Sequence, residues 1–175
     1  MKKLIPVLFA MVLLPHLSFA QMIWFQANLN GWQENPPVNT SATGWATASL
    51  DLSSNLFVFH DVWSGLSAPS TASHIHAPAP IGTNAPVIIP FTAANGFIAG
   101  TTMGTVDYSG ALTALQANQL LNGLFYVNVH STSFPGGEIR GQLVPVPEPA
   151  TYAAAGGALL LLALTLRLRK RHAEP

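Results

Sequence analysis

The sequence predicts an all-β domain over residues 21–145, described best as a Greek-key or immunoglobulin-like β-sandwich with one short helix. Turn signals such as Asn30-Gly31, Asn122-Gly123 and Gly136-Gly137 divide this region into short runs of β-forming residues. Within the runs, apolar and polar side chains alternate with a period of two, as in half-buried strands. The two ends of the chain differ in composition and are interpreted separately.

Seven strands and one helix are expected in this domain. The helix is predicted over residues 114–121, across one end of the sandwich, because Thr113 and Gln116 match a capping box and Gly123 can end it. The expected strands, in chain order, are residues 23–29, 45–52, 56–63, 86–91, 97–108, 124–130 and 138–143.

Residues 1–20 have the pattern of a secretory signal peptide. Lys2 and Lys3 form the charged start, residues 4–14 the apolar core, and Ser18-Phe19-Ala20 a small-residue cleavage site before Gln21. We therefore expect export, with signal peptidase as a partner; an uncleaved membrane anchor is the alternative.

Residues 152–168 form a second apolar run, interrupted only by Thr165 and Arg167. As a helix this run would be about 25 Å long, slightly short of a bilayer core of about 30 Å. Arg167 can extend towards the lipid head groups, and a basic tail follows it. The pattern predicts a single transmembrane helix in an inner-membrane precursor, with the tail in the cytoplasm.

Composition excludes several classes of protein. Charged residues make up 8% of the chain, against about 25% in an average soluble protein. Arg140 is the only Lys or Arg between residues 21 and 146, so no basic face is available for nucleic acid. The absence of cysteine excludes disulfides, thiolate metal sites and a cysteine nucleophile. A surface of uncharged polar residues suits weak contacts with polysaccharide, although it also fits an exported domain without that role.

Histidines form the one chemically informative pattern in the domain. His74 and His76 are two residues apart, so on a strand both imidazoles project from the same face. His130 ends a later predicted strand. If a hairpin closes over residues 131–137, His130 faces Glu138, Asn128 faces Arg140, and Tyr126 faces Gln142.

Two interpretations of these residues stay open. In the first, His74, His76 and His130 bind copper or zinc, Asn128 or Glu138 supports the ligands, and Arg140 attracts an anion. In the second, the polar ladder joins two strands and the histidines bind backbone groups. His60 alternates with valines and is expected to be packed or edge-exposed. No hydrolase or glycosidase motif is present.

The C-terminal 30 residues resemble a PEP-CTERM sorting signal. The resemblance rests on Pro147-Glu148-Pro149, the apolar run after it and the basic tail, and covers residues 146–175. It implies an exopolysaccharide-producing Gram-negative bacterium and processing by an exosortase, a membrane protease, near the Pro-Glu-Pro motif. A processed product would lose the membrane helix.

The central region resembles a CHRD domain, the module named after chordin. The resemblance covers almost all of residues 25–144, with Asn35 and Ala77 as small departures from the family pattern. It implies an exported β-sandwich module without a settled biochemical activity. The matching segments are 29–40 (LNGWQENPPVNT), 65–66 (GL), 74–80 (HIHAPAP), 126–131 (YVNVHS) and 134–143 (FPGGEIRGQL).

A weaker resemblance links the histidines to copper–zinc superoxide dismutases, which share a Greek-key sandwich. It makes His74, His76 and His130 similar to copper ligands, and Arg140 to the arginine that guides superoxide. The zinc-site histidines, the acidic bridge and the disulfide have no counterpart, and a fold analogy alone supplies no activity.

Taken together, these patterns predict an exported module of the cell envelope or extracellular matrix, sorted by an exosortase and without catalytic activity. Its expected partners are signal peptidase, exosortase, the membrane and exopolysaccharide. The alternative is a copper- or zinc-binding protein with superoxide dismutase-like redox chemistry.

Overall fold

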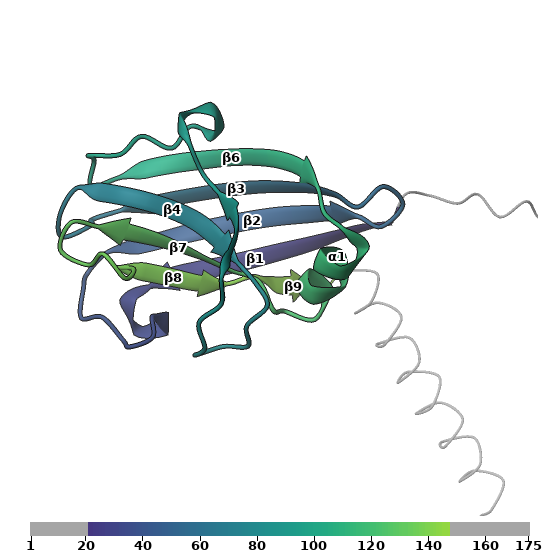
Figure 1. Cartoon of the computed structure of the whole chain (residues 1–175), viewed down its shortest axis with the longest axis horizontal. Helices are drawn as coiled ribbons and strands as arrows, with labels where there is room; N and C mark the ends of the chain where they lie inside the picture. Colours follow the sequence, from purple (N-terminus) through teal and green to yellow (C-terminus); the bar gives the residue numbers. More distant parts are fainter. Residues whose placement is uncertain (1–20, 148–175) are drawn as a thin grey trace, which may run out of the picture.

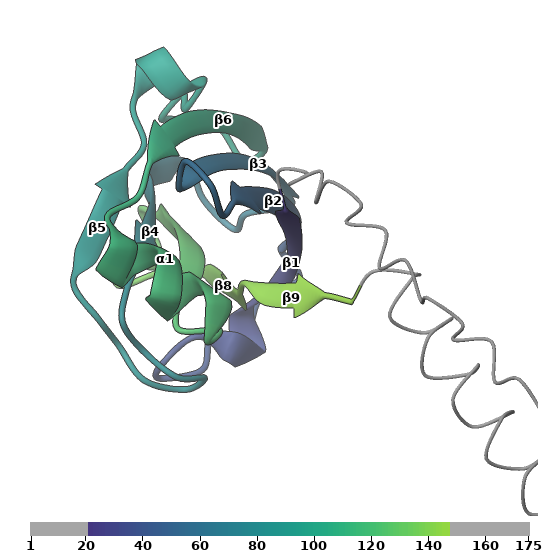
Figure 2. The same ribbon diagram turned by 90° about the vertical axis from the view of Figure 1, so that its right-hand side faces the viewer.

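The computed structural model describes residues 21–147, which form one antiparallel sheet curled until its two halves face each other (Figures 1 and 2). Its strand order is β5-β4-β7-β8-β1-β2-β3-β6, and β9 also pairs with β1. The strands are β1 (Met22–Asn30), β2 (Thr43–Asp51), β3 (Leu56–Ser64), β4 (Ser70–His76), β5 (Val87–Pro90), β6 (Gly104–Ala111), β7 (Tyr126–Ser131), β8 (Ile139–Gln142) and β9 (Val144–Val146).

The prediction of an all-β domain is confirmed, and the facing halves make the fold sandwich-like. The two halves nevertheless belong to one continuous sheet. They are joined where β8 meets β1 at the single pair Asn30–Arg140, and β9 continues along β1 with three more pairs. The chain crosses between the halves after β3, after β5 and after β6, as it does in Greek-key connections.

The core lies between the two halves and follows from strand alternation. On β3, every second side chain is buried, beginning with Phe57 and Phe59. Phe59 stacks on Phe91, with ring centroids 5.3 Å apart. Burying a side chain of this size stabilises the fold by about 1.5–3 kcal/mol relative to leaving it exposed.

The helix α1 (Ala114–Leu121) has the predicted bounds and lies across one end of the curled sheet (Figure 2). Thr113 and Gln116 form the predicted capping box, and Gly123 follows with a φ of 68°. Ala117 and Leu120 are buried, so the helix closes this end of the core.

The strand predicted over residues 97–108 is only partly correct. β6 begins at Gly104, and residues 97–103 form a loop after the short 3-10 helix η2 (Ala93–Asn95). Phe97 is buried because it packs against Trp63, with ring centroids 6.1 Å apart, and Gly100 has a φ of 87° that interrupts extended structure. The apolar pattern that predicts a strand here therefore reflects Phe97, which packs against the core from a loop.

No helix within residues 21–147 is long and apolar enough to cross a membrane. The predicted signal peptide, the predicted transmembrane helix at 152–168 and the motif residues Glu148 and Pro149 lie outside the described residues.

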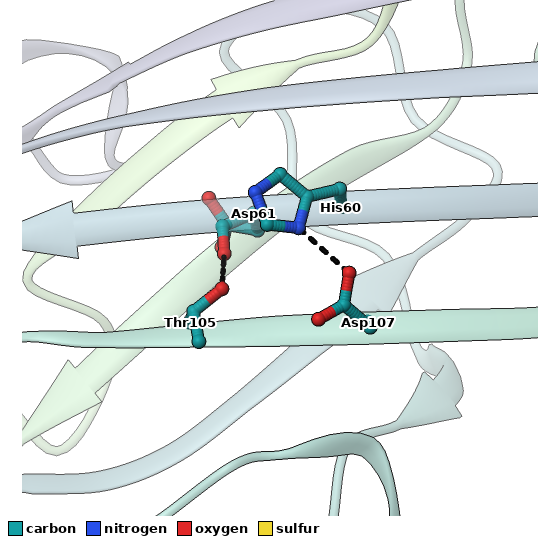
Figure 3. A network of polar contacts seen from close by, with 4 residues as sticks. All are labelled: His60, Asp61, Thr105 and Asp107. Carbon is teal, nitrogen blue, oxygen red and sulfur yellow. Dashed lines mark hydrogen bonds and ion pairs between the residues drawn. The ribbon is translucent and has the colours of Figure 1, made fainter.

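Asp61 occupies a core position on β3, between the buried Phe59 and Trp63. Both of its carboxylate oxygens are buried without a hydrogen-bond partner. Its backbone carbonyl accepts a hydrogen bond from the Thr105 hydroxyl at 2.9 Å (Figure 3). Burial raises the pKa of the Asp61 carboxyl to about 8, so the group is mostly neutral at pH 7.

This carboxyl gives the first testable prediction. Since its folded pKa lies above the value of 3.8 in a model peptide, the folded state binds more protons between about pH 4 and 8. Its contribution to the free energy of unfolding therefore falls as pH rises through this range, by up to about 1.4 kcal/mol per pH unit.

Urea unfolding of the wild type and of Asp61→Asn at pH 5 and pH 8 measures the effect. Other titrating groups cancel in the comparison, and we expect the variant to gain stability relative to wild type at pH 8. Parallel pH profiles would contradict this expectation.

A three-histidine candidate metal site

The candidate site lies on the outer face of β4 and β7. Ile75 and Val129 point into the core with no exposed surface, so their neighbours along the strands point outwards. The pairing of the strands sets His74 opposite Asn128 and His76 opposite Tyr126, with His130 two residues further along β7. Two adjacent strands therefore bring all three predicted ligands to one place.

The three imidazoles are close enough to share one ion. One ring nitrogen from each of His74, His76 and His130 lies within 4.8 Å of the other two. Nδ1 of His74 is 3.1 Å from Nε2 of His76, and the rings of His74 and His130 have centroids 4.6 Å apart.

Backbone carbonyls determine which ring nitrogen of His76 and of His130 carries the proton and which keeps its lone pair. Nδ1 of His76 lies 2.8 Å from the carbonyl oxygen of Ala85, and Nδ1 of His130 lies 2.8 Å from that of Pro135. A carbonyl can only accept, so these nitrogens carry the proton and each Nε2 keeps a lone pair. Nε2 of His130 is buried and has no hydrogen-bond partner.

The histidines are uncharged at neutral pH. Burial lowers the pKa of His74 to about 4, assisted by the neighbouring His130 and His76. Burial also lowers the pKa of His76 and of His130. Neutral imidazole is the form that binds a metal, so an incoming ion would not have to displace protons from the ligands.

Asn128 lies at the centre of the cluster, as the sequence suggested. Its Oδ1 is 3.2 Å from Nδ1 of His74 and 3.1 Å from Nε2 of His76. Burial raises the pKa of the neighbouring Glu34 carboxyl to about 7, against the lowering effects of the charge on Arg140 and of the Asn128 side chain.

Sequence reasoning missed Glu34. A lone acid in a loop carries no pattern of its own, and only the fold brings the segment after β1 next to β7. A Cβ placed on Gly137 would lie 2.4 Å from Oε1 of Glu34 and 2.9 Å from Nδ2 of Asn128, so this glycine is needed for the close approach.

Arg140 is placed opposite Asn128, as predicted, but its guanidinium contacts a loop. It donates to the carbonyl oxygen of Thr83 at 2.7 Å and to Oδ1 of Asn84 at 3.2 Å. It also lies 3.3 Å above the ring of Tyr126, which stacks on His76. Arg140 is 1% exposed. Its contacts with Thr83 and Asn84 hold the loop of residues 77–86 over the site.

Glu138 makes its contacts away from the histidines. The β7–β8 ladder includes the predicted pair Tyr126–Gln142 and ends at Val129 and Ile139, one step before Glu138. Oε1 of Glu138 accepts hydrogen bonds from the Thr40 hydroxyl and from the backbone nitrogen of Ser67, each at 2.7 Å.

The remaining predicted residues lie elsewhere. His60 is exposed on β3, and its Nδ1 lies 2.7 Å from Oδ1 of Asp107 (Figure 3). Pro147 is exposed immediately after β9.

The arrangement of the three histidines can accommodate a copper or zinc ion on three imidazoles, with the half-buried His74 at its solvent side.

One of the comparisons with known proteins gives a match. The family model of the CHRD domain matches residues 25–143. No curated protein and no solved structure matches the chain. The family match covers more than half of the sequence and all strands except part of β1 and the short β9. The chain therefore belongs to the CHRD domain family, and this membership supports an exported, extracellular protein.

Proposed function

We propose that this chain is an exported, non-catalytic CHRD module that binds one copper or zinc ion through His74, His76 and His130. The observation that carries the proposal is the convergence of one ring nitrogen from each histidine within 4.8 Å, together with the buried Nε2 of His130, which has no hydrogen-bond partner. A buried polar atom without a hydrogen bond costs about 1–3 kcal/mol, and a metal ion would remove this cost.

The arrangement of the ligands also supports binding. The carbonyls of Ala85 and Pro135 fix two imidazoles with Nε2 directed at the cluster, which is how outer contacts orient metal-binding histidines. An all-imidazole ligand set suits copper and zinc better than calcium or magnesium, which prefer oxygen. A purely structural role for the histidines would account for the two Nδ1 contacts and leave the buried Nε2 of His130 unexplained.

The geometry favours binding over redox catalysis. In the analogy with superoxide dismutases, Arg140 would attract the anionic substrate. Here its guanidinium is buried and bonded to Thr83 and Asn84. Superoxide chemistry is therefore the second candidate, supported only by the three imidazoles and the partial exposure of His74.

We propose the localisation of the protein from its sequence. The predicted signal peptide at 1–20 supports export through signal peptidase, and the Pro147-Glu148-Pro149 signal supports sorting by an exosortase. The product would then move from an inner-membrane precursor to the cell surface or the extracellular matrix, where exopolysaccharide is its proposed surrounding.

Metal binding can be measured directly. We expect the purified protein, offered Cu²⁺ or Zn²⁺ and dialysed, to retain one ion per chain with a dissociation constant below about 1 μM. His130→Ala and the double change His74→Ala/His76→Ala should each weaken binding more than about 100-fold, because they remove ligands. Metal analysis and calorimetric titration are the measurements.

His60→Ala is the matched control, since His60 is exposed and paired with Asp107 outside the cluster. It should bind metal like the wild type, and circular dichroism should show that all variants are folded. The proposed site would be refuted if the wild type retained no metal, or if His60→Ala lost as much metal affinity as the variants that lack a proposed ligand. Superoxide decay with the copper-loaded protein tests the second candidate.

Processing of the chain can be tested in its own cells. We expect surface material to begin at Gln21, because the small residues Ser18 and Ala20 direct cleavage there. Replacing Pro147-Glu148-Pro149 by three alanines should leave the C-terminal segment attached and the protein in the membrane fraction. Mass spectrometry of the surface and membrane fractions measures both outcomes. Surface delivery of the alanine variant, shortened as in wild type, would contradict the sorting proposal.

A further inference from the structure

The opposite half of the sheet carries two exposed tryptophans on its outer face. Phe25 and Ala46 point into the core, so Trp24 on β1 and Trp45 on β2 point outwards, with 53% and 38% of their surface exposed. Val58 and Val62 on β3 are exposed on the same face, and exposed apolar side chains that gather on one face mark an interaction surface more often than isolated ones do. The histidine cluster is carried by the other half, on β4 and β7.

Each tryptophan borders a hollow that also has hydrogen-bonding side chains. The first hollow measures about 470 Å³ and places Trp45 and Val62 beside the polar side chains of Asn28, Thr43 and Ser64. A second, smaller hollow places Trp24 beside Thr47, Ser49 and His60. Both hollows therefore combine an aromatic wall with amide, hydroxyl or imidazole groups.

The two hollows lie along one line of the sheet. In the β1–β2 ladder, Trp24 is opposite Ser49 and Trp45 is opposite Asn28. Four residues along a strand and one step across the sheet separate the tryptophans by about 14 Å. Between them runs a polar row of Gln26, Thr47, His60 and Asp107, which neighbour one another across β1, β2, β3 and β6.

The face presents very little charge. Oδ1 of Asp107 lies 2.7 Å from Nδ1 of His60, and the Asp107 side chain is 75% exposed (Figure 3). Asp51, at the far end of β2, accepts hydrogen bonds from Ser53 and Ser54. The only Lys or Arg between residues 21 and 146 is Arg140, which is buried at the histidine site. The two carboxylates on this face have no exposed Lys or Arg to balance them, so a ligand that matches the face is polar and not anionic.

We propose that the outer face of β1, β2 and β3 binds a neutral polysaccharide chain, with Trp24 and Trp45 as its two stacking platforms. A pyranose ring has an apolar C–H face and a rim of hydroxyl groups. An indole ring can cover the first, and amide and hydroxyl side chains can bond the second. An extended chain of sugars fits a line of two hollows on a sheet better than a single small molecule does. This binding surface is independent of the proposed metal site.

The test uses the full chain, purified in a non-ionic detergent without a sugar head group. The probes are insoluble cellulose and chitin and a soluble mixed-linkage β-glucan, with alginate as the acidic comparison. We expect retention by at least one neutral glycan, and about tenfold weaker binding for each of Trp24→Ala and Trp45→Ala. Trp45→Phe should keep most of the affinity, because it keeps an aromatic platform.

Trp32→Ala is the matched control, since Trp32 is 72% exposed but lies on the 3-10 helix η1 (Gly31–Gln33) and lines neither hollow. It should bind like the wild type, as should His130→Ala, which separates glycan binding from metal binding. The proposal is overturned if no neutral glycan retains the wild type, if alginate alone does, or if the double variant Trp24→Ala/Trp45→Ala binds unchanged. It is also overturned if sedimentation shows that the wild type and the control variants are dimers while Trp24→Ala/Trp45→Ala is a monomer. That result would mean that a second copy of the chain covers this face.

Discussion

The structure depends on strict side-chain alternation in strands that have one face in the core. On β4 and β7, Ile75, Val127 and Val129 are fully buried, and this fixes the register of both strands. A slip of one residue would exchange the core residues with His74, His76 and Asn128, at the cost of burying their polar groups in an apolar interior. The hydrophobic core therefore determines the geometry of the histidine cluster, although no core side chain belongs to it.

The outer face of these strands is polar yet buried, and loops make this possible. Residues 77–86 cover the face and are held by Arg140, by Nδ1 of His76 and by the side-chain amide of Gln142, which donates to Ala79. Residues 131–138 cover the other side, where the carbonyl oxygen of Pro135 accepts a hydrogen bond from Nδ1 of His130. Loops that orient the ligands also exclude water from them, which explains why burial lowers the pKa of all three histidines.

Much of this arrangement could be predicted from the sequence because it follows from local rules. The His-x-His spacing, the hairpin over residues 131–137 and the capping box at Thr113 each depend on a few neighbouring residues. The missed features depend on long-range contacts. Glu34 reaches Asn128 only through the packing of the segment after β1, and Asp61 follows the alternation of β3 although its side chain is acidic. Alternation on β3 does place Asp61 among the buried residues, but an acid is not expected there because acids are usually exposed, and Glu34 lies in a loop where alternation gives no position.

The distribution of charge connects the interior with the two proposed binding surfaces. Six charged side chains lie between residues 21 and 146, and four of them are almost completely buried: Glu34, Asp61, Glu138 and Arg140. This reverses the usual pattern, in which charged groups cover the surface. The exposed pair, Asp51 and Asp107, is bonded to neighbouring side chains. The outer surface of the domain consequently consists mostly of uncharged side chains, both polar ones and exposed apolar ones such as Trp24, Ile81 and Leu115. Such a surface attracts ligands only weakly through long-range electrostatics, and its two carboxylates disfavour anions, so it selects mainly by contact and favours a neutral, hydroxyl-rich partner over an acidic one.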